Sequence, residues 1–279
     1  MLTRIIVGLI FAVVYLTFLL ILPPVGLACG MAFVCALAFV VGLAAHELLR
    51  ATKAANHGGM YTTTVVFAAY IPIGYSLGVG EQAVRLSLLV VMIVLFFTAI
   101  RHYDNGEETV NYEQILICLF ASVLVPFCLS SLVQLRMMEN GRFLVLLPVI
   151  CANLTDVGAY FVGMFLGKHR GVTKVSPNKS LEGYVGGILF GCLIMMLYAV
   201  VLRQYGGVQA SLPIMALYGL IGSAVTELGD LSFSLIKRQY GVKDYGNLMP
   251  GHGGMMDRFD STVFAAPTIL LLVELFPAF

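Results

Sequence analysis

The chain alternates between long apolar runs and short polar connections. Most runs are about 20 residues long, the length that a helix needs to cross a bilayer, and they lack the alternation of apolar and polar positions typical of strands. Only helices satisfy every backbone group in a bilayer without closing a barrel. The pattern therefore predicts an all-α polytopic integral membrane protein with about nine transmembrane helices. The predicted spans are Ile5–Leu22, Val25–Leu48, Tyr61–Leu77, Val84–Ile100, Gln114–Leu132, Phe143–Phe165, Tyr184–Leu202, Leu212–Ile236 and Ser261–Phe276.

Composition agrees with this pattern, because 59% of the 279 residues are hydrophobic and only 11% are charged. The mean hydropathy is +0.94, far above that of a soluble domain. We therefore expect a single membrane-embedded domain over residues 1–279. The six cysteines lie inside apolar runs and form no Cys-x-x-Cys pair, which argues against a zinc site or a disulfide framework.

The distribution of Lys and Arg predicts the orientation. A cytoplasmic N-terminus places 12 of the 16 basic residues on the inner side, as the positive-inside rule requires. Both long polar loops, Gly167–Gly183 and Lys237–Asp260, then face the cytoplasm, where nucleotides are available. The inner basic residues are Arg4, Arg50, Lys53, Arg101, Lys168, Arg170, Lys174, Lys179, Lys237, Arg238, Lys243 and Arg258.

The eighth span carries a polar stripe. Glu227, Asp230, Ser234 and Lys237 are spaced so that they share one face of a helix. Carboxylates inside an apolar helix are costly and normally face the bundle interior or a water-filled cavity. An ion pair within the helix would explain them. A hard cation such as Mg²⁺ would explain them as well, because it takes one or two carboxylates and completes its shell with phosphate oxygens and water.

A second carboxylate, Asp257, falls in the first turn expected for the ninth helix. It could cap that helix, or it could share a cation with Asp230. The preceding loop is rich in Gly and Pro, so its backbone could approach a phosphate closely. His252 in this loop could donate to a phosphate or simply hold the loop. The Gly and Pro residues are Gly246, Pro250, Gly251, Gly253 and Gly254.

The other inner loop is basic. Between Gly167 and Gly183 it holds four Lys or Arg residues against Glu182 alone, a local balance of +3. The positive-inside rule accounts for the charge. It does not account for the Pro turn before Ser180, which is a candidate N-cap of the next helix. The helix before the loop carries a second polar stripe, formed by Asn153, Asp156 and Tyr160.

The polar segment from Ser234 to Asp260 resembles the signature of the CDP-diacylglycerol synthases, also called phosphatidate cytidylyltransferases. The resemblance lies in Ser234-x-Ile236-Lys237-Arg238, Lys243-Asp244-x-Gly246 and Pro250-x-His252-Gly253-Gly254-Met255-x-Asp257-Arg258-Phe259-Asp260. Two further stretches are similar to the same family, Ser176–Gly183 and Asn153-x-x-Asp156 with Gly167-Lys168. The similarity covers the C-terminal half of the chain, and residues 1–140 match only as apolar helices. Met249 departs conservatively from the family's usual Leu, Ile or Phe.

This resemblance implies a nucleotidyltransferase of phospholipid biosynthesis that transfers CMP from CTP to phosphatidic acid and gives CDP-diacylglycerol and pyrophosphate. Residues 1–140 would then be a helical scaffold, and 141–279 would supply the catalytic helices and cytoplasmic loops of a cell-membrane enzyme. The expected partners are CTP, phosphatidic acid and membrane lipid, with no nucleic acid, and a homodimer stays open.

The resemblance also implies a set of site residues. Asp230 and Asp257 would hold Mg²⁺ in a paired-cation site. Catalytic roles fall to Asp230, Asp257, Lys237, Arg238 and Lys243. Substrate-binding roles fall to Lys168, Lys179, Ser180, Asn153, Asp156, Asp244, His252, Gly253, Gly254, Arg258 and Asp260.

Two other functions fit parts of the sequence. An ion-coupled transporter also places acidic residues near helix breaks, but it would move a substrate without nucleotide turnover. A CTP-dependent lipid kinase uses related chemistry, but it would release CDP instead of pyrophosphate. The nucleotide product separates the three.

Overall fold

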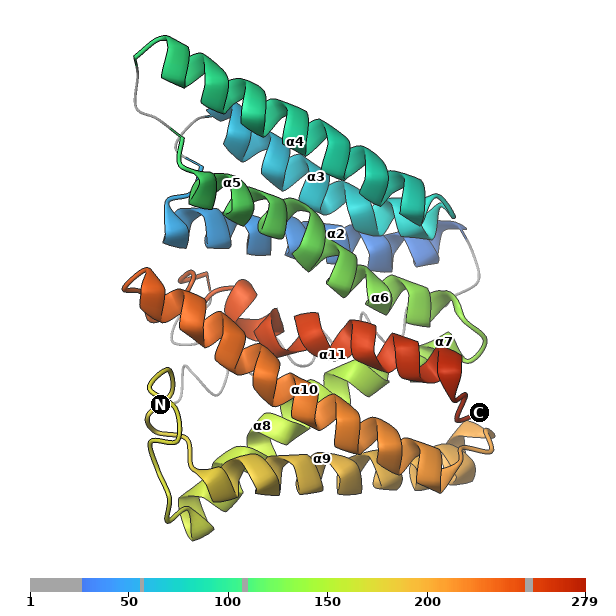
Figure 1. Ribbon diagram of the computed structural model, residues 1–279. Coiled ribbons are helices and arrows are strands. Elements are labelled where there is room, and N and C mark those ends of the chain that lie inside the picture. Colours follow the sequence, from blue (N-terminus) through green and yellow to red (C-terminus); the bar gives the residue numbers. More distant parts are fainter. Residues whose placement is uncertain (1–26, 56–57, 107–109, 249–252) are drawn as a thin grey trace. The chain divides into compact units, whose positions relative to one another are not determined.

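The computed structural model describes residues 27–55, 58–106, 110–248 and 253–279 (Figure 1). These residues form helices joined by loops, and in this part of the chain the only β pairing is an isolated bridge between Arg170 and Ser180. The predicted all-α fold is confirmed. The first predicted span, Ile5–Leu22, lies outside the described residues, and so does His252. The chain divides into two compact units, which we describe one at a time.

Unit 1 comprises residues 1–142 and 240–259. Its helix α3 packs against α2, α4 and α6, so it lies at the centre of the unit's described helices (Figure 1). Small residues permit close packing here, since a Cβ added at Gly74 of α3 would lie 2.3 Å from the Ala83 Cβ of α4. The helices are α2 (Leu27–Thr52), α3 (Gly58–Ser76), α4 (Gly80–Asp104), α5 (Tyr112–Leu119), the π-helical turn η1 (Phe120–Leu124) and α6 (Val125–Met137). The short α7 (Gly141–Leu144) follows at the boundary.

Unit 2 comprises residues 143–239 and 260–279. Helix α9 packs against both α8 and α10 through a stripe of glycines spaced four residues apart. A Cβ added at one of them, Gly191, would lie 2.0 Å from Ser223 Oγ and 2.7 Å from Thr155 Oγ1. The helices are α8 (Leu146–Leu166), α9 (Leu181–Val201) with its π-helical end η2 (Leu202–Gly206), α10 (Leu212–Gln239) and most of α11 (Met256–Leu275).

Among the residues that the structure describes, six segments are long and apolar enough to cross a membrane, which supports a multi-pass membrane protein. The predicted spans Tyr61–Leu77 and Ser261–Phe276 form the helices α3 and α11, which are not among the six. Gly, Thr and Tyr dilute the apolar residues of α3, and charged residues open α11. The count of nine and the orientation stay predictions. The six are Met31–Thr52, Gly80–Asp104, Tyr112–Met137, Gly141–Leu166, Leu181–Gly206 and Leu212–Gln239.

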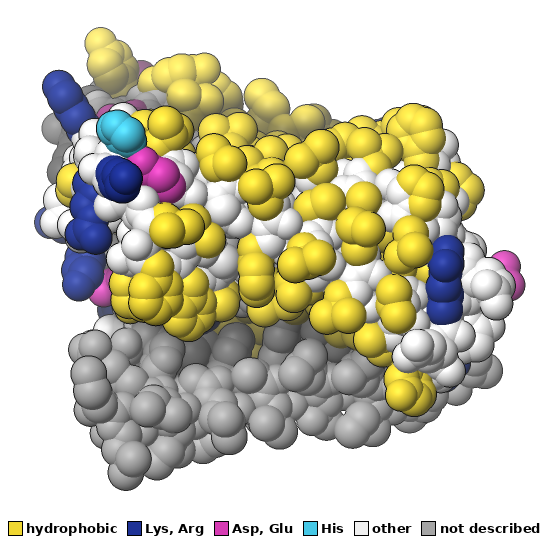
Figure 2. Space-filling view, turned by 90° about the horizontal axis from the view of Figure 1, so that it is seen from below, with side chains coloured by type: hydrophobic (Ala, Val, Ile, Leu, Met, Phe, Trp, Pro, Cys, Tyr) yellow, Lys and Arg dark blue, Asp and Glu magenta, His cyan; other side chains and the backbone are white. Residues whose placement is uncertain are grey.

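The outer face of α9 is apolar. Its outward side chains Val185, Leu189, Leu193 and Leu197 are 52–61% exposed, which water would disfavour and lipid accommodates. Figure 2 shows a face of the molecule on which hydrophobic side chains cover the middle and most of the visible Lys and Arg gather at one end. This distribution is typical of a protein whose apolar band lies in a bilayer.

Candidate functional site

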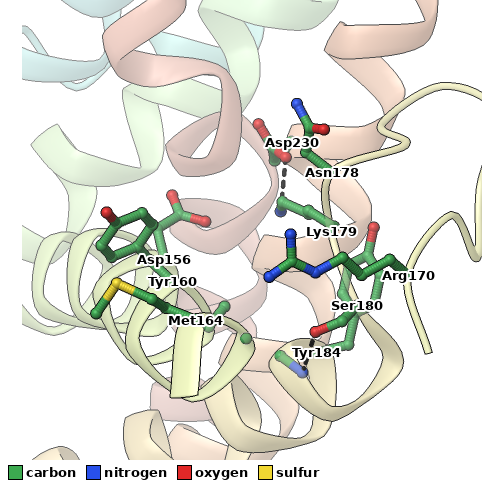
Figure 3. A pocket seen from close by; sticks show the side chains of 12 residues that line it. Asp156, Tyr160, Met164, Arg170, Asn178, Lys179, Ser180, Tyr184 and Asp230 are labelled. Atoms are coloured by element: carbon green, nitrogen blue, oxygen red, sulfur yellow. Dashed lines mark hydrogen bonds and ion pairs between the residues drawn. The ribbon is translucent and has the colours of Figure 1, made fainter. Parts of the chain in front are cut away.

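A cavity of about 550 Å³ opens within unit 2, between α8, the start of α9, α10 and the loop before α9. In Figure 3, side chains of α8 face side chains of the loop across it, and Asp230 of α10 lies between the two groups. The α8 side chains are Asp156, Tyr160 and Met164, and those of the loop include Arg170, Asn178, Lys179 and Ser180. The cavity thus combines an apolar edge with acidic and basic groups.

The loop before α9 turns back on itself, and this turn positions its basic side chains. Backbone hydrogen bonds run from Gly171 N to the Lys179 carbonyl and from Leu181 N to the His169 carbonyl, at 3.3 and 3.0 Å. Ser180 has extended backbone geometry and accepts a hydrogen bond from Gly183 N at 3.1 Å, so it is the N-cap that the sequence predicted. The capped helix end therefore fixes the residue before it, Lys179, beside the cavity.

Lys179 forms the centre of a charged group that we call the cavity cluster: Lys179, Glu227 and Asp230. Its ammonium lies 2.7 Å from Glu227 Oε2 and 2.7 Å from Asp230 Oδ2. The same ammonium lies 5.3 Å from the centre of the Tyr184 ring, a cation–π distance. Burial by itself would lower the pKa of Lys179, but the carboxylates of Asp230 and Glu227 outweigh burial and hold that pKa above its ordinary range. Lys179 is therefore charged at neutral pH.

The cavity region holds more acidic than basic groups. Glu227 is only 4% exposed, and its Oε1 atom has no hydrogen-bond partner among the described residues. Asp156, which also lines the cavity, accepts a hydrogen bond from Ser261 Oγ at 3.5 Å. With all groups ionised, the three carboxylates outnumber the ammonium of Lys179 and the guanidinium of Arg170, leaving a formal charge of −1. A phosphate-bearing substrate at this place needs additional positive charge.

Further along α10, Lys237 is buried and lies 3.5 Å from Asp260 Oδ2 of α11. Asp260 also accepts a hydrogen bond from Ser261 N at 2.8 Å, so its carboxylate is held by two neighbours. The next residue, Arg238, is exposed and donates from Nε to the Val175 carbonyl of the basic loop at 3.5 Å. Both basic side chains thus have contacts within unit 2, but neither lines the cavity.

In unit 1, Asp257 faces backbone N–H groups. Its Oδ2 atom accepts from Tyr245 N and from Gly254 N, each at 2.9 Å. Gly253 has a left-handed φ of +80°, and a Cβ there would lie 2.9 Å from the same oxygen. Asp257 therefore organises the loop that precedes α11, and this contact is of the capping kind that the sequence left open beside metal binding.

A second carboxylate, Glu47 of α2, holds the same loop. It is 6% exposed, and its Oε2 atom accepts a hydrogen bond from Met256 N at 2.8 Å. Two loop glycines make room for it: a Cβ on Gly246 would lie 2.4 Å from Oε1, and one on Gly254 would lie 2.3 Å from Oε2. We call Glu47, Asp257 and the backbone that they bind the loop cluster.

The predicted site residues fall in three groups. Four of them line the cavity, namely Asp156, Lys179, Ser180 and Asp230. Five lie elsewhere in unit 2, namely Asn153, Lys168, Lys237, Arg238 and Asp260. Six belong to unit 1, namely Lys243, Asp244, Gly253, Gly254, Asp257 and Arg258. Their catalytic and binding roles stay predictions. Asn153 is exposed and its amide donates to the Val149 carbonyl of its own helix at 2.9 Å.

Four residues that the structure brings to the cavity or the loop cluster were not among the predicted site residues. Glu227 belonged to the polar stripe of the eighth span, and the stripe was the signal for it. Arg170 and Tyr184 line the cavity but were counted only as part of a basic loop and of an apolar helix. Glu47 lies within the second predicted span, and no local pattern pointed to a partner 209 residues away.

The predicted metal ligands, Asp230 and Asp257, belong to different units. No group of three or more His, Cys, Asp or Glu side chains within the described ranges is arranged to hold a metal ion. Magnesium does not require such a group, since it binds through one or two carboxylates and completes its shell with phosphate oxygens and water. Asp230, which lines the cavity, is a carboxylate of this kind.

Comparison with known proteins shows similarity along nearly the whole chain. Residues 2–276 match a model described as the cytidylyltransferase family. The chain is 30% identical to a phosphatidate cytidylyltransferase of Bacillus subtilis, an alignment that covers 98% of this chain and 97% of that protein. It is 29% identical to a phosphatidate cytidylyltransferase of Staphylococcus haemolyticus, over 92% of this chain and 96% of that protein.

Proposed function

The chain belongs to the cytidylyltransferase family, and from this premise we propose how its residues carry out the reaction. The protein is a phosphatidate cytidylyltransferase, a nucleotidyltransferase that moves CMP from CTP to phosphatidic acid and gives CDP-diacylglycerol and pyrophosphate. The observation that carries this function is similarity along nearly the whole chain, including a relative of that name that is 30% identical over 98% of it. The transporter and lipid-kinase alternatives find no such support.

The cavity of unit 2 is proposed to receive the phosphate of the lipid substrate. Lys179 and Arg170 supply positive charge beside it, and Tyr160 and Met164 form an apolar edge. Tyr160 is 65% exposed and Met164 is 46% exposed, so this edge faces outward from α8. The headgroup would enter sideways between helices while the acyl chains stay in the bilayer.

The transfer itself needs positioning and charge neutralisation more than a strong base. A phosphate oxygen of phosphatidic acid attacks the α-phosphorus of CTP, a new P–O bond forms, and the bond to pyrophosphate breaks. The attacking phosphomonoester already carries about −1.5 to −2 charge near pH 7, so no proton has to be abstracted. Lys237, Arg238, Lys243 and Arg258 are proposed to hold the triphosphate and the departing pyrophosphate, and Asp260 orients Lys237.

We propose that Asp230 and Asp257 each bind Mg²⁺ when the nucleotide is present. The cation would supply positive charge to the phosphate oxygens during transfer. The charges that line the cavity support this proposal, because two carboxylates balance the two basic groups there and leave no positive charge to neutralise two phosphate-bearing substrates. We further propose that these groups face the cytoplasm, because the basic loops that the positive-inside rule assigns to that side carry Lys168, Lys179 and Arg238.

An assay of the purified protein tests this function. Phosphatidic acid, Mg²⁺ and each nucleoside triphosphate in turn are supplied in detergent micelles, and the nucleotide product is identified. We expect release of pyrophosphate with CTP and formation of CDP-diacylglycerol. Release of CDP with a phosphorylated lipid would identify a kinase instead, and a lack of nucleotide turnover would refute both enzymes and favour the transporter.

A further inference from the structure

Glu47 lies far from the signature segment in the sequence but contacts it in unit 1. Its carboxylate is 6% exposed and receives the Met256 N–H at 2.8 Å. Met256 opens α11 and directly precedes Asp257. Glu47 therefore fixes the backbone at the point from which the Asp257 side chain departs.

The contact is electrostatically favourable. A buried carboxylate is costly unless it is hydrogen-bonded, and the exposed N–H groups at a helix N-terminus, with the helix dipole, offer it compensation. Arg50, three residues further along α2, is the Lys or Arg residue nearest to Glu47 in the sequence. Arg50 is exposed, and no ion pair joins the two in the described structure. The Glu47 carboxylate thus binds the Met256 N–H of the loop and not Arg50 of its own helix.

The glycines of the loop are fitted to Glu47. Any side chain at Gly246 or Gly254 would collide with its carboxylate, because the added Cβ atoms would lie 2.4 and 2.3 Å from its oxygens. Gly254 also donates its N–H to Asp257 Oδ2. The two carboxylates therefore bind the same short backbone segment through neighbouring groups.

We propose that Glu47 is a positioning residue of the transfer reaction: it holds the backbone at Gly254 and Met256 so that the Asp257 carboxylate is correctly directed. This rests on the proposed function, because it gives Asp257 a role in CMP transfer. It also assigns a direct contribution to the N-terminal helices, which the sequence treated as a scaffold.

Two variants of Glu47 test the proposal. Glu47→Ala removes the acceptor of the Met256 N–H, and Glu47→Gln keeps an acceptor of the same length without the charge. Thr52→Ala is the matched control, because Thr52 is also buried in α2 but its hydroxyl donates to the Leu48 carbonyl of its own helix at 2.8 Å. The measurements are hydrogen exchange of the Tyr245, Gly254 and Met256 amides, the rate of pyrophosphate release, and the Mg²⁺ concentration that gives half the maximal rate.

We expect Glu47→Ala to speed exchange at these three amides and to lower the turnover rate about 100-fold, the order expected for a misplacement of about 1 Å at a reacting group. It should also raise the Mg²⁺ concentration at half-maximal rate. A general folding defect would lower the active fraction but leave that concentration unchanged. Glu47→Gln should have a turnover rate at least tenfold higher than that of Glu47→Ala. Thr52→Ala should resemble the wild type in all three measurements.

The proposal fails if Glu47→Ala leaves exchange and the Mg²⁺ dependence at the wild-type values. It also fails if Glu47→Gln is as inactive as Glu47→Ala while exchange is normal in both, because the charge would then matter and not the placement of the loop. A wild-type protein that releases no pyrophosphate would instead refute the proposed function. Hydrogen exchange would still decide whether Glu47 holds the loop.

Discussion

The two units stabilise their buried and half-buried carboxylates in different ways. In the cavity cluster, Asp230 and Glu227 are compensated by the ammonium of Lys179, a long side chain at the edge of an open cavity. In the loop cluster, Glu47 and Asp257 are compensated by backbone N–H groups. Both arrangements lower the cost of burying charge, and the first uses a partner, the Lys179 side chain, that can move without unfolding a helix end.

This difference suggests that the two clusters have different roles in the reaction. A lysine that spans two carboxylates can exchange them for a substrate phosphate or yield them to a metal ion, whereas a carboxylate bound by backbone amides keeps one orientation. The cavity cluster is therefore suited to groups whose partners change during the reaction cycle. The loop cluster is suited to holding a backbone, and one carboxylate, in a fixed place. The following substitutions test whether the two clusters differ in this way.

The largest effect is expected in the cavity cluster, for Asp230→Asn. The amide cannot replace a charge that neutralises Lys179 and binds a cation, and losing such an electrostatic contribution lowers turnover by about 1,000-fold. Pyrophosphate release from CTP measures this effect, with unfolding temperature as the check on folding. Ser232→Ala on the same helix is the control, because the Ser232 hydroxyl donates only to the Leu228 carbonyl of α10 among the hydrogen bonds described. A near-normal rate for Asp230→Asn would remove Asp230 from the metal assignment.

Asp257→Asn distinguishes the two roles left open for this residue. Asn is a good helix cap and can still accept a hydrogen bond, so a purely capping residue should keep its rate within a few-fold. We expect a loss of about 100-fold instead, with an unfolding temperature near that of the wild type, because a metal-binding carboxylate loses its charge. Retention of the rate would make the whole loop cluster structural.

Lys179→Met should produce a smaller effect on the rate but a clear one on stability. It leaves Asp230 and Glu227 without their cation, and because Lys179 is partly exposed we expect a loss of about 2 kcal/mol in the free energy of unfolding. The two carboxylates are then available to a divalent ion. Mg²⁺ should consequently raise the unfolding temperature of this variant more than that of the wild type. Lys174→Met, which removes an exposed lysine of the same loop, is the control. Equal responses to Mg²⁺ would show that the cavity cluster does not exchange cations.

The two clusters also differ in how far the sequence could predict them. The helices follow from local apolar runs: Leu212–Ile236 was predicted and α10 spans Leu212–Gln239. The stripe of Glu227 and Asp230 followed from helical spacing, and the Ser180 cap followed from its Pro turn. Each of these signals lies within a few residues, where backbone geometry alone sets the neighbours.

Contacts between distant segments had no such signal. Lys179 meets Glu227 across 48 residues, and Glu47 meets Met256 across 209 residues. Which helices lie side by side depends on packing, and the spacing of Gly183, Gly187 and Gly191 permits close packing without naming the partner helix. The glycines of the signature loop illustrate the same limit. Their number suggested an approach to phosphate, which stays a prediction, and no local pattern showed that carboxylates lie against Gly246, Gly253 and Gly254.

The smallest effect is expected for Ser180→Ala. This substitution weakens the positioning of Lys179 and leaves the charges of the cavity cluster unchanged. Ser180 caps the start of α9, so the loss of its hydroxyl should cost about 1 kcal/mol of stability. Lys179 keeps both carboxylates, and turnover should fall no more than about fivefold because the loop frays without losing charge. Ser180→Asp restores a capping oxygen and should recover the stability. A loss of turnover as large as that of Lys179→Met, with the stability intact, would instead mean that the Ser180 hydroxyl binds substrate, as the family resemblance implies.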